Sequence, residues 1–124
     1  MGGRIIIADD DYTLLMYLRK QLEAEGYEVD EASNGGIAFD RLAEANYDLA
    51  IIDYEMPLMG GKEFCEKVRE SEQFKNLPVI LVTAHATRTE QDFLADGATA
   101  VMFKPLEIEA LVAKITEVTG KKGA

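Results

Sequence analysis

The chain has 124 residues, 48% of them hydrophobic, which suffices for one ordinary domain with a single core and leaves no room for a second. Its formal net charge of -10 repels phosphate polymers and acidic membrane surfaces, so we expect no direct nucleic-acid or membrane partner. The single cysteine, Cys65, excludes an internal disulfide and a cysteine-rich metal site, and suits a cytoplasmic location.

Short apolar runs and amphipathic segments alternate along the chain. The runs are rich in β-branched residues and too short for helices, which is typical of parallel strands buried on both faces. In chain order they predict strands at 4–8, 27–32, 49–53, 78–82 and 100–103, each followed by a helix, at 11–25, 35–45, 60–71, 87–96 and 106–119. Five successive βα units predict an α/β fold, a three-layer doubly wound domain with a five-stranded parallel sheet.

Polar or charged residues close four of these strands. Asp9 and Asp10 follow the first, Asp53 ends the third, Thr83 follows the fourth and Lys104 follows the fifth. Because parallel strands bring their carboxyl ends to one edge of the sheet, where ligands of open α/β folds bind, we expect these side chains to converge. The sequence therefore predicts a polar site at this edge.

The residue types in this predicted site indicate phosphoryl chemistry. Three clustered carboxylates repel one another unless a divalent cation lies among them, and oxygen-only ligands favour Mg²⁺, for which Mn²⁺ can substitute. Lys104 and Thr83 would offer a positive charge and a hydroxyl donor to a phosphoryl group, and a carboxylate is an attested nucleophile. The competing interpretation is that Asp9, Asp10 or Asp11 serves only as the cap of the 11–25 helix.

Over its whole length the sequence resembles the receiver domains of two-component response regulators. The matching features are Asp9-Asp10, Asp53 within Ile-Ile-Asp-Tyr-Glu-Met-Pro, Gly60-Gly61, Thr83-Ala84, Gly97-Ala98 and Phe-Lys-Pro at 103–105. Each feature alone is weak, but their order and spacing are specific. The resemblance implies a single receiver domain over residues 1–124, with a core at about 4–119 and the flavodoxin-like strand order 2-1-3-4-5.

The resemblance also assigns the phosphorylation chemistry. It implies that Asp53 takes a phosphoryl group from a histidine kinase or a histidine phosphotransfer protein, and that Thr83 and Lys104 contact that group. The chain would then be a signalling switch that catalyses its own phosphorylation and dephosphorylation, not a metabolic enzyme. Its output would pass to a downstream effector protein or domain.

The metal ligands are implied in the same way. Asp10 and Asp53 would bind Mg²⁺ directly, the backbone carbonyl of Glu55 would be a third ligand, and Asp9 would act through water. The resemblance further implies a cis bond between Lys104 and Pro105.

Four residues are expected to modulate or transmit the signal. Glu55 and His85 flank the phosphoryl group in the resembled fold, so we expect them to modulate attack by water. The switch residues are Thr83 and Val101, but Val101 stands where the family often has a Tyr or Phe that swings inward. A small β-branched side chain cannot trade an exposed for a buried ring position, so we expect the signal to travel through the segment after Thr83.

One enzyme family is an alternative. Asp9-Asp10-Asp11-Tyr12-Thr13 fits the Asp-x-Asp-x-Thr start of haloacid-dehalogenase-type phosphatases, in which Asp9 would be the nucleophile and Asp11 the general acid. That family places a pair of metal-binding acids on a strand after its lysine, and none follows Lys104. The receiver interpretation is therefore favoured.

Overall fold

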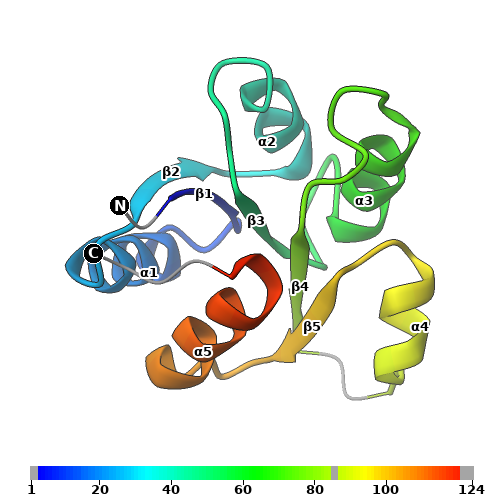
Figure 1. Cartoon of the computed structure of the whole chain (residues 1–124). Helices are drawn as coiled ribbons and strands as arrows, with labels where there is room; N and C mark the ends of the chain where they lie inside the picture. The colour runs from blue at the N-terminus through cyan, green and yellow to red at the C-terminus, as the bar shows by residue number, and fades with distance from the viewer. Residues whose placement is uncertain (1–2, 85–86, 121–124) are drawn as a thin grey trace.

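A computed structural model describes residues 3–84 and 87–120 of the chain. Five parallel strands form one sheet in the order β2-β1-β3-β4-β5, as predicted, with helices on both faces (Figure 1). The elements, in chain order, are β1 (Arg4–Ala8), α1 (Tyr12–Ala24), β2 (Glu28–Ala32), α2 (Gly35–Arg41), β3 (Leu49–Asp53), α3 (Gly61–Glu70), β4 (Val79–Thr83), α4 (Glu90–Ala95), β5 (Ala100–Phe103) and α5 (Ile108–Thr119).

Burial of the strands follows their place in the sheet. All five residues of β3 and of β4 are buried, because these central strands are covered on both faces. The edge strand β2 is less apolar, and it exposes Glu28 while burying Val29 and Ala32. The sheet is therefore ordered by hydrophobicity, with the most apolar runs at its centre.

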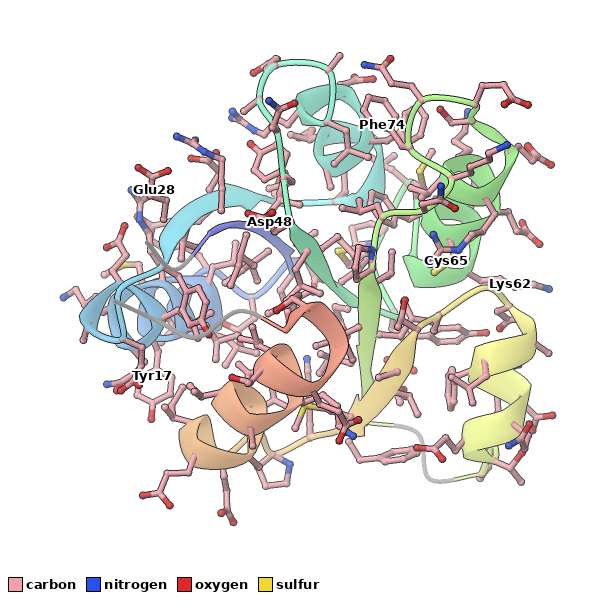
Figure 2. All side chains as sticks on the ribbon, in the orientation of Figure 1. Tyr17, Glu28, Asp48, Lys62, Cys65 and Phe74 are labelled. Carbon is pink, nitrogen blue, oxygen red and sulfur yellow. The ribbon has the colours of Figure 1, made fainter. Side chains whose placement is uncertain are left out.

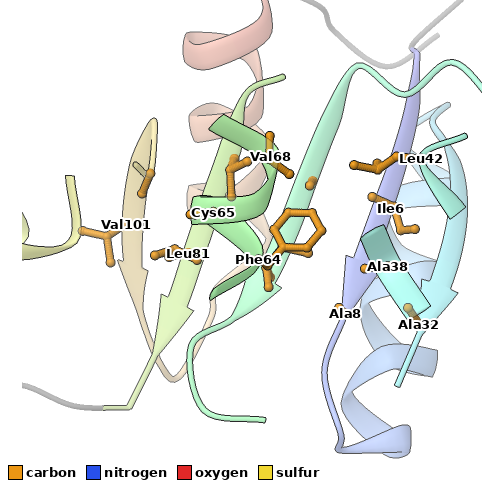
Figure 3. Packing of buried hydrophobic residues seen from close by; sticks show 14 of the residues in the cluster. Ile6, Ala8, Ala32, Ala38, Leu42, Phe64, Cys65, Val68, Leu81 and Val101 are labelled. Atoms are coloured by element: carbon orange, nitrogen blue, oxygen red, sulfur yellow. The ribbon is translucent and has the colours of Figure 1, made fainter. Parts of the chain in front are cut away.

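Two apolar clusters, one on each face of the sheet, make up the core. One lies under α1 and α5 and contains Leu18, Leu22 and Leu111. The other lies under α2, α3 and α4, and Figure 3 shows Phe64 of α3 in its middle, between Leu81 and Ile6. The helices thus cover both faces of the sheet.

Cys65 lies in the second cluster and is fully buried. Burial raises the pKa of its thiol to about 12, so Cys65 is a packed apolar residue and not a reactive one. By contrast, Tyr17 and Lys62 point outward from α1 and α3 (Figure 2).

All five helices are shorter than the sequence predicts; α1 and α3 lose one residue at each end, and the other three lose more at one end. α2 ends at Arg41 because the next amides bond three residues back, Leu42 N to Phe39 O and Glu44 N to Arg41 O, so the chain continues in tighter turns. α4 begins at Glu90 because Thr89 and Asp92 form a capping box. α5 begins at Ile108, after its N-cap Glu107.

Within the described part of the chain, no helix is long and apolar enough to cross a bilayer.

Candidate functional site

The carboxyl ends of the strands bring the predicted site residues to one edge of the sheet. Asp53 is the last residue of β3 and pairs in register with Val82, the neighbour of Thr83 on β4. Thr83 in turn pairs with Phe103, the residue before Lys104. Asp9 and Asp10 follow β1, which lies beside β3. The expected convergence of these residues is therefore seen in the structure.

Three carboxylates cluster at this edge. One oxygen each of Asp9, Asp10 and Asp53 lies within 4.8 Å of the other two. Asp9 and Asp53 are each only 4% exposed, whereas Asp10 is open to solvent. The cluster offers oxygen donors alone, which is the donor set that hard divalent cations prefer.

The cap of α1 is a separate residue. Asp11 accepts a hydrogen bond from the amide of Leu14 at 3.2 Å and is the N-cap, while Asp9 Oδ1 accepts one from the amide of Asp11 at 2.8 Å. Asp9 therefore supports the cap, and neither Asp9 nor Asp10 is the capping residue itself.

Lys104 lies against the buried carboxylates. Its Nζ is 3.2 Å from Asp9 Oδ2 and 3.5 Å from Asp53 Oδ1. Burial lowers the pKa of Lys104, but the charges of Asp53 and Asp9 outweigh that effect and hold the pKa above its ordinary value. Lys104 thus stays positively charged, and its bond to Pro105 is cis, as the resemblance implies.

Asp53 has an unusual environment for a carboxylate. Burial, reinforced by the charge of Asp9 and opposed by Lys104, raises the pKa of Asp53 from 3.8 to about 6. Its Oδ1 is buried and accepts no hydrogen bond from any residue of 3–84 or 87–120; the 3.5 Å contact with Lys104 is an ion pair. A buried carboxylate oxygen with so little compensation is one that a cation would stabilise.

Thr83 is fully buried and its hydroxyl donates to the carboxylate of Glu55, at 3.2 Å to Oε2. Glu55 stands two residues after Asp53, so this bond joins the segment that follows β3 to the last residue of β4. Sequence reasoning placed both residues at the site but missed their contact, because it depends on the conformation of the loop after β3.

The predicted transmission residues fall in different places. Val101 is buried in the cluster under α4, beside Leu81 (Figure 3), so it is a packing residue with no exposed position to leave. Phe103 is 43% exposed, with its ring edge-on to Phe93 at 6.2 Å. His85 lies outside the described residues.

The close approach of β3 and α3 explains the Gly60-Gly61 pair. A Cβ on Gly60 would stand 2.6 Å from the carbonyl oxygen of Tyr54, and one on Gly61 would stand 2.7 Å from Leu81 Cδ2. Both glycines let the chain turn tightly after Asp53 and fix the loop that carries Glu55.

A cavity of about 360 Å³ lies at the opposite edge, where β3 and β4 begin, near Asp48 and Phe74 (Figure 2). None of the predicted site residues lines it. Its lining consists of Leu42, Ala45, Asn46, Tyr47, Asp48, Gln73, Phe74, Asn76, Leu77 and Pro78.

The sequence matches known proteins along almost all of its length. The profile of the response regulator receiver domain family matches residues 5–116. The chain is 39% identical over 114 residues to the sensor protein EvgS of Escherichia coli K12, and 36% identical over 116 residues to the phosphate regulon transcriptional regulatory protein PhoB of Rhizobium meliloti. These alignments cover 91% and 93% of this chain, but 9% of EvgS and 51% of PhoB.

Solved structures agree with the sequence matches. The chemotaxis protein CheY4 of Vibrio cholerae superposes with a TM-score of 0.88 at 30% identity, over 95% of this chain and 99% of that one. A CheY-like receiver domain protein of Methanospirillum hungatei gives a TM-score of 0.84 at 34% identity, over 94% and 93%.

These findings decide between the two families that the sequence suggested. The family match and the strand order support the receiver, and Asp11, the general acid of the phosphatase alternative, is the N-cap of α1. The chain belongs to the response regulator receiver domain family.

Proposed function

We propose that Asp53 is the phosphoacceptor of a phosphorylation-controlled switch and that residues 1–124 act as a single receiver domain. The observation that carries the proposal is the buried carboxylate of Asp53, within reach of Lys104 and clustered with Asp9 and Asp10. A histidine kinase or a histidine phosphotransfer protein would donate the phosphoryl group, and an effector protein or domain would receive the output. The chain and both of its partners would be located in the cytoplasm.

The transfer is a displacement at phosphorus. A carboxylate oxygen of Asp53 forms a bond to phosphorus while the bond from phosphorus to the imidazole nitrogen of the donor breaks. Lys104, already 3.5 Å from Asp53 Oδ1, would bind a phosphoryl oxygen and offset its charge. In the dephosphorylation step, water attacks phosphorus, the bond from phosphorus to Asp53 breaks, and inorganic phosphate leaves.

The carboxylate cluster fits Mg²⁺. Asp10 and Asp53 would hold the ion directly with the backbone carbonyl of Glu55, and Asp9, which already bonds Lys104 and the amide of Asp11, would reach it through water. When bound, Mg²⁺ or Mn²⁺ supplies positive charge to the transferring phosphoryl group. The under-coordinated Oδ1 of Asp53 supports this assignment.

Thr83 and Glu55 would connect the site to the rest of the domain. A phosphoryl group on Asp53 brings acceptor oxygens that compete with Glu55 for the Thr83 hydroxyl, and its charge repels the Glu55 carboxylate. Phosphorylation would therefore draw Thr83 inward and shift a two-state equilibrium of the segment leading to α4.

Labelling with a small-molecule phosphodonor tests the proposal without a partner protein. Acetyl phosphate should add one phosphoryl group per chain, measured by intact mass, when Mg²⁺ is present and not when it is chelated. Asp53→Asn should abolish the label, whereas the matched control Asp40→Asn, an exposed carboxylate on α2, should keep it. Normal labelling of Asp53→Asn, or labelling that ignores chelation, would refute the proposal.

A further inference from the structure

Tyr54, the residue after Asp53, is held in a fixed position. Its amide donates to Val82 O at 2.8 Å and its carbonyl accepts from the amide of Gly61 at 3.0 Å. Its ring meets the ring of Phe93 on α4 edge-on, with centroids 5.0 Å apart. Tyr54 therefore links the backbone of the phosphoacceptor directly to α4.

Arg88 fastens this link from the other side. Its guanidinium, just ahead of the N-cap of α4, donates to the Tyr54 hydroxyl, to Asp96 Oδ2 at 2.9 Å and to the backbone oxygen of Asp92 at 3.1 Å. It also lies over the rings of Phe93, at 4.5 Å, and Tyr54, at 5.2 Å. One planar cation thus bridges both ends of α4 and the loop after Asp53, a geometry that lysine cannot reproduce.

The same aromatic contact reaches the other side of the site. Phe93 also packs edge-on against Phe103, which precedes Lys104, so α4 touches the chain neighbours of both Asp53 and Lys104. Figure 1 shows α4 at the margin of the molecule beside β5. Val101 is buried and has no ring to move, so among the described residues these aromatic contacts offer a direct connection from the site to α4.

We propose that Arg88 is a positioning residue that clamps α4 to Tyr54 in the arrangement adopted while Asp53 is an unmodified carboxylate. The inference rests on the proposed function, since it describes how the state of Asp53 reaches α4. Drawing Thr83 toward a phosphoryl group moves the segment that leads to Arg88, and this movement breaks the bridge to Tyr54. The clamp therefore opposes activation, and removing it makes activation easier.

Beryllofluoride, which imitates a phosphoryl group on a carboxylate, measures this coupling. In a titration with Mg²⁺ followed by amide NMR, Arg88→Met should bind beryllofluoride about fivefold more tightly than the parent chain, in the range typical of allosteric couplings. Arg88→Lys should increase the affinity for beryllofluoride by less than Arg88→Met does. Tyr54→Phe, which keeps the ring against Phe93 but removes the hydroxyl, should also tighten binding and provides a second test if Arg88→Met folds poorly.

A matched control separates the clamp from a general loss of ion pairs. Arg19 bonds Glu23 at 3.1 Å on the exposed side of α1, and Arg19→Met should leave beryllofluoride affinity unchanged. If Arg88→Met and Tyr54→Phe lower the unfolding free energy but bind beryllofluoride as the parent does, Arg88 is merely structural and the inference is wrong. If these variants bind beryllofluoride more weakly than the parent chain, the clamp belongs to the activated state and the inference is also wrong. If the parent chain itself fails to bind beryllofluoride, the proposed function is refuted, and the inference about Arg88, which rests on it, is refuted as well.

Discussion

Replacing Asp53 by Asn should stabilise the metal-free protein, and the gain should depend on pH. The folded-state pKa of Asp53 is about 6, against 3.8 for an ordinary aspartate, so folding disfavours its ionised form. Below its unfolded-state pKa, such a carboxyl group is protonated in both the folded and the unfolded state, and it does not lower the unfolding free energy. The penalty grows as pH rises through the interval between 3.8 and about 6 and is complete above it.

The size of the effect follows from the two pKa values. A difference of this size corresponds to roughly 3 kcal/mol of unfolding free energy, and because Asp53 is almost wholly buried, solvent screening reduces it little. Asn is nearly isosteric and neutral, so it removes the penalty without leaving a cavity.

Urea unfolding in the presence of a chelator measures this effect. The unfolding free energy of Asp53→Asn should exceed that of the parent chain by up to about 3 kcal/mol at about pH 8, and by little at about pH 4. Saturating Mg²⁺ should narrow the difference, because the ion stabilises only the folded parent chain. An equal difference at both pH values, or a destabilised variant at about pH 8, would refute the electrostatic account of this site.

Further predictions concern the metal, the switch and the core. Asp10→Asn removes a proposed direct ligand and should weaken Mg²⁺ binding roughly tenfold or more while the fold persists; an unchanged titration would refute that ligand role. Glu55→Ala removes the acceptor that competes for the Thr83 hydroxyl, so beryllofluoride should bind more tightly and the lifetime of phospho-Asp53 should change several-fold. If the affinity and the lifetime both equal those of the parent chain, Glu55 has no part in the mechanism. Thr83→Ala should still be labelled on Asp53 but should blunt the amide-exchange changes that beryllofluoride causes at residues 87–96; a parental response contradicts the switch. Phe64→Ala, which empties the middle of the core under α3, should cost about 3–5 kcal/mol in urea unfolding, and a loss below about 1 kcal/mol would show that the cluster repacks.

The sheet could be predicted because its strands are set by hydrophobic runs whose ends carry the polar residues. β3 at 49–53 and β5 at 100–103 have the predicted bounds, and this accuracy placed Asp53 and Lys104 at the correct edge. The start of α4 could also have been read from Thr89 and Asp92, whose spacing is that of a capping box.

The contacts between distant segments of the chain could not be predicted from the sequence. The Thr83–Glu55 bond joins residues 28 apart, and the Arg88–Tyr54 bond joins residues 34 apart. Neither pair has a periodic signal, since each contact depends on side-chain rotamers and on how distant segments of the chain are placed. Fold and site composition thus follow from local patterns, whereas the coupling between site and helix follows only from tertiary geometry.

The most direct test of the central claim is to find which residue carries the phosphoryl group. After labelling with acetyl phosphate and Mg²⁺, the acyl phosphate can be trapped by reduction and located by peptide mass spectrometry. The receiver mechanism predicts that the trapped residue is Asp53 and that Asp9 is unmodified. A label on Asp9, or on any residue other than Asp53, would contradict it.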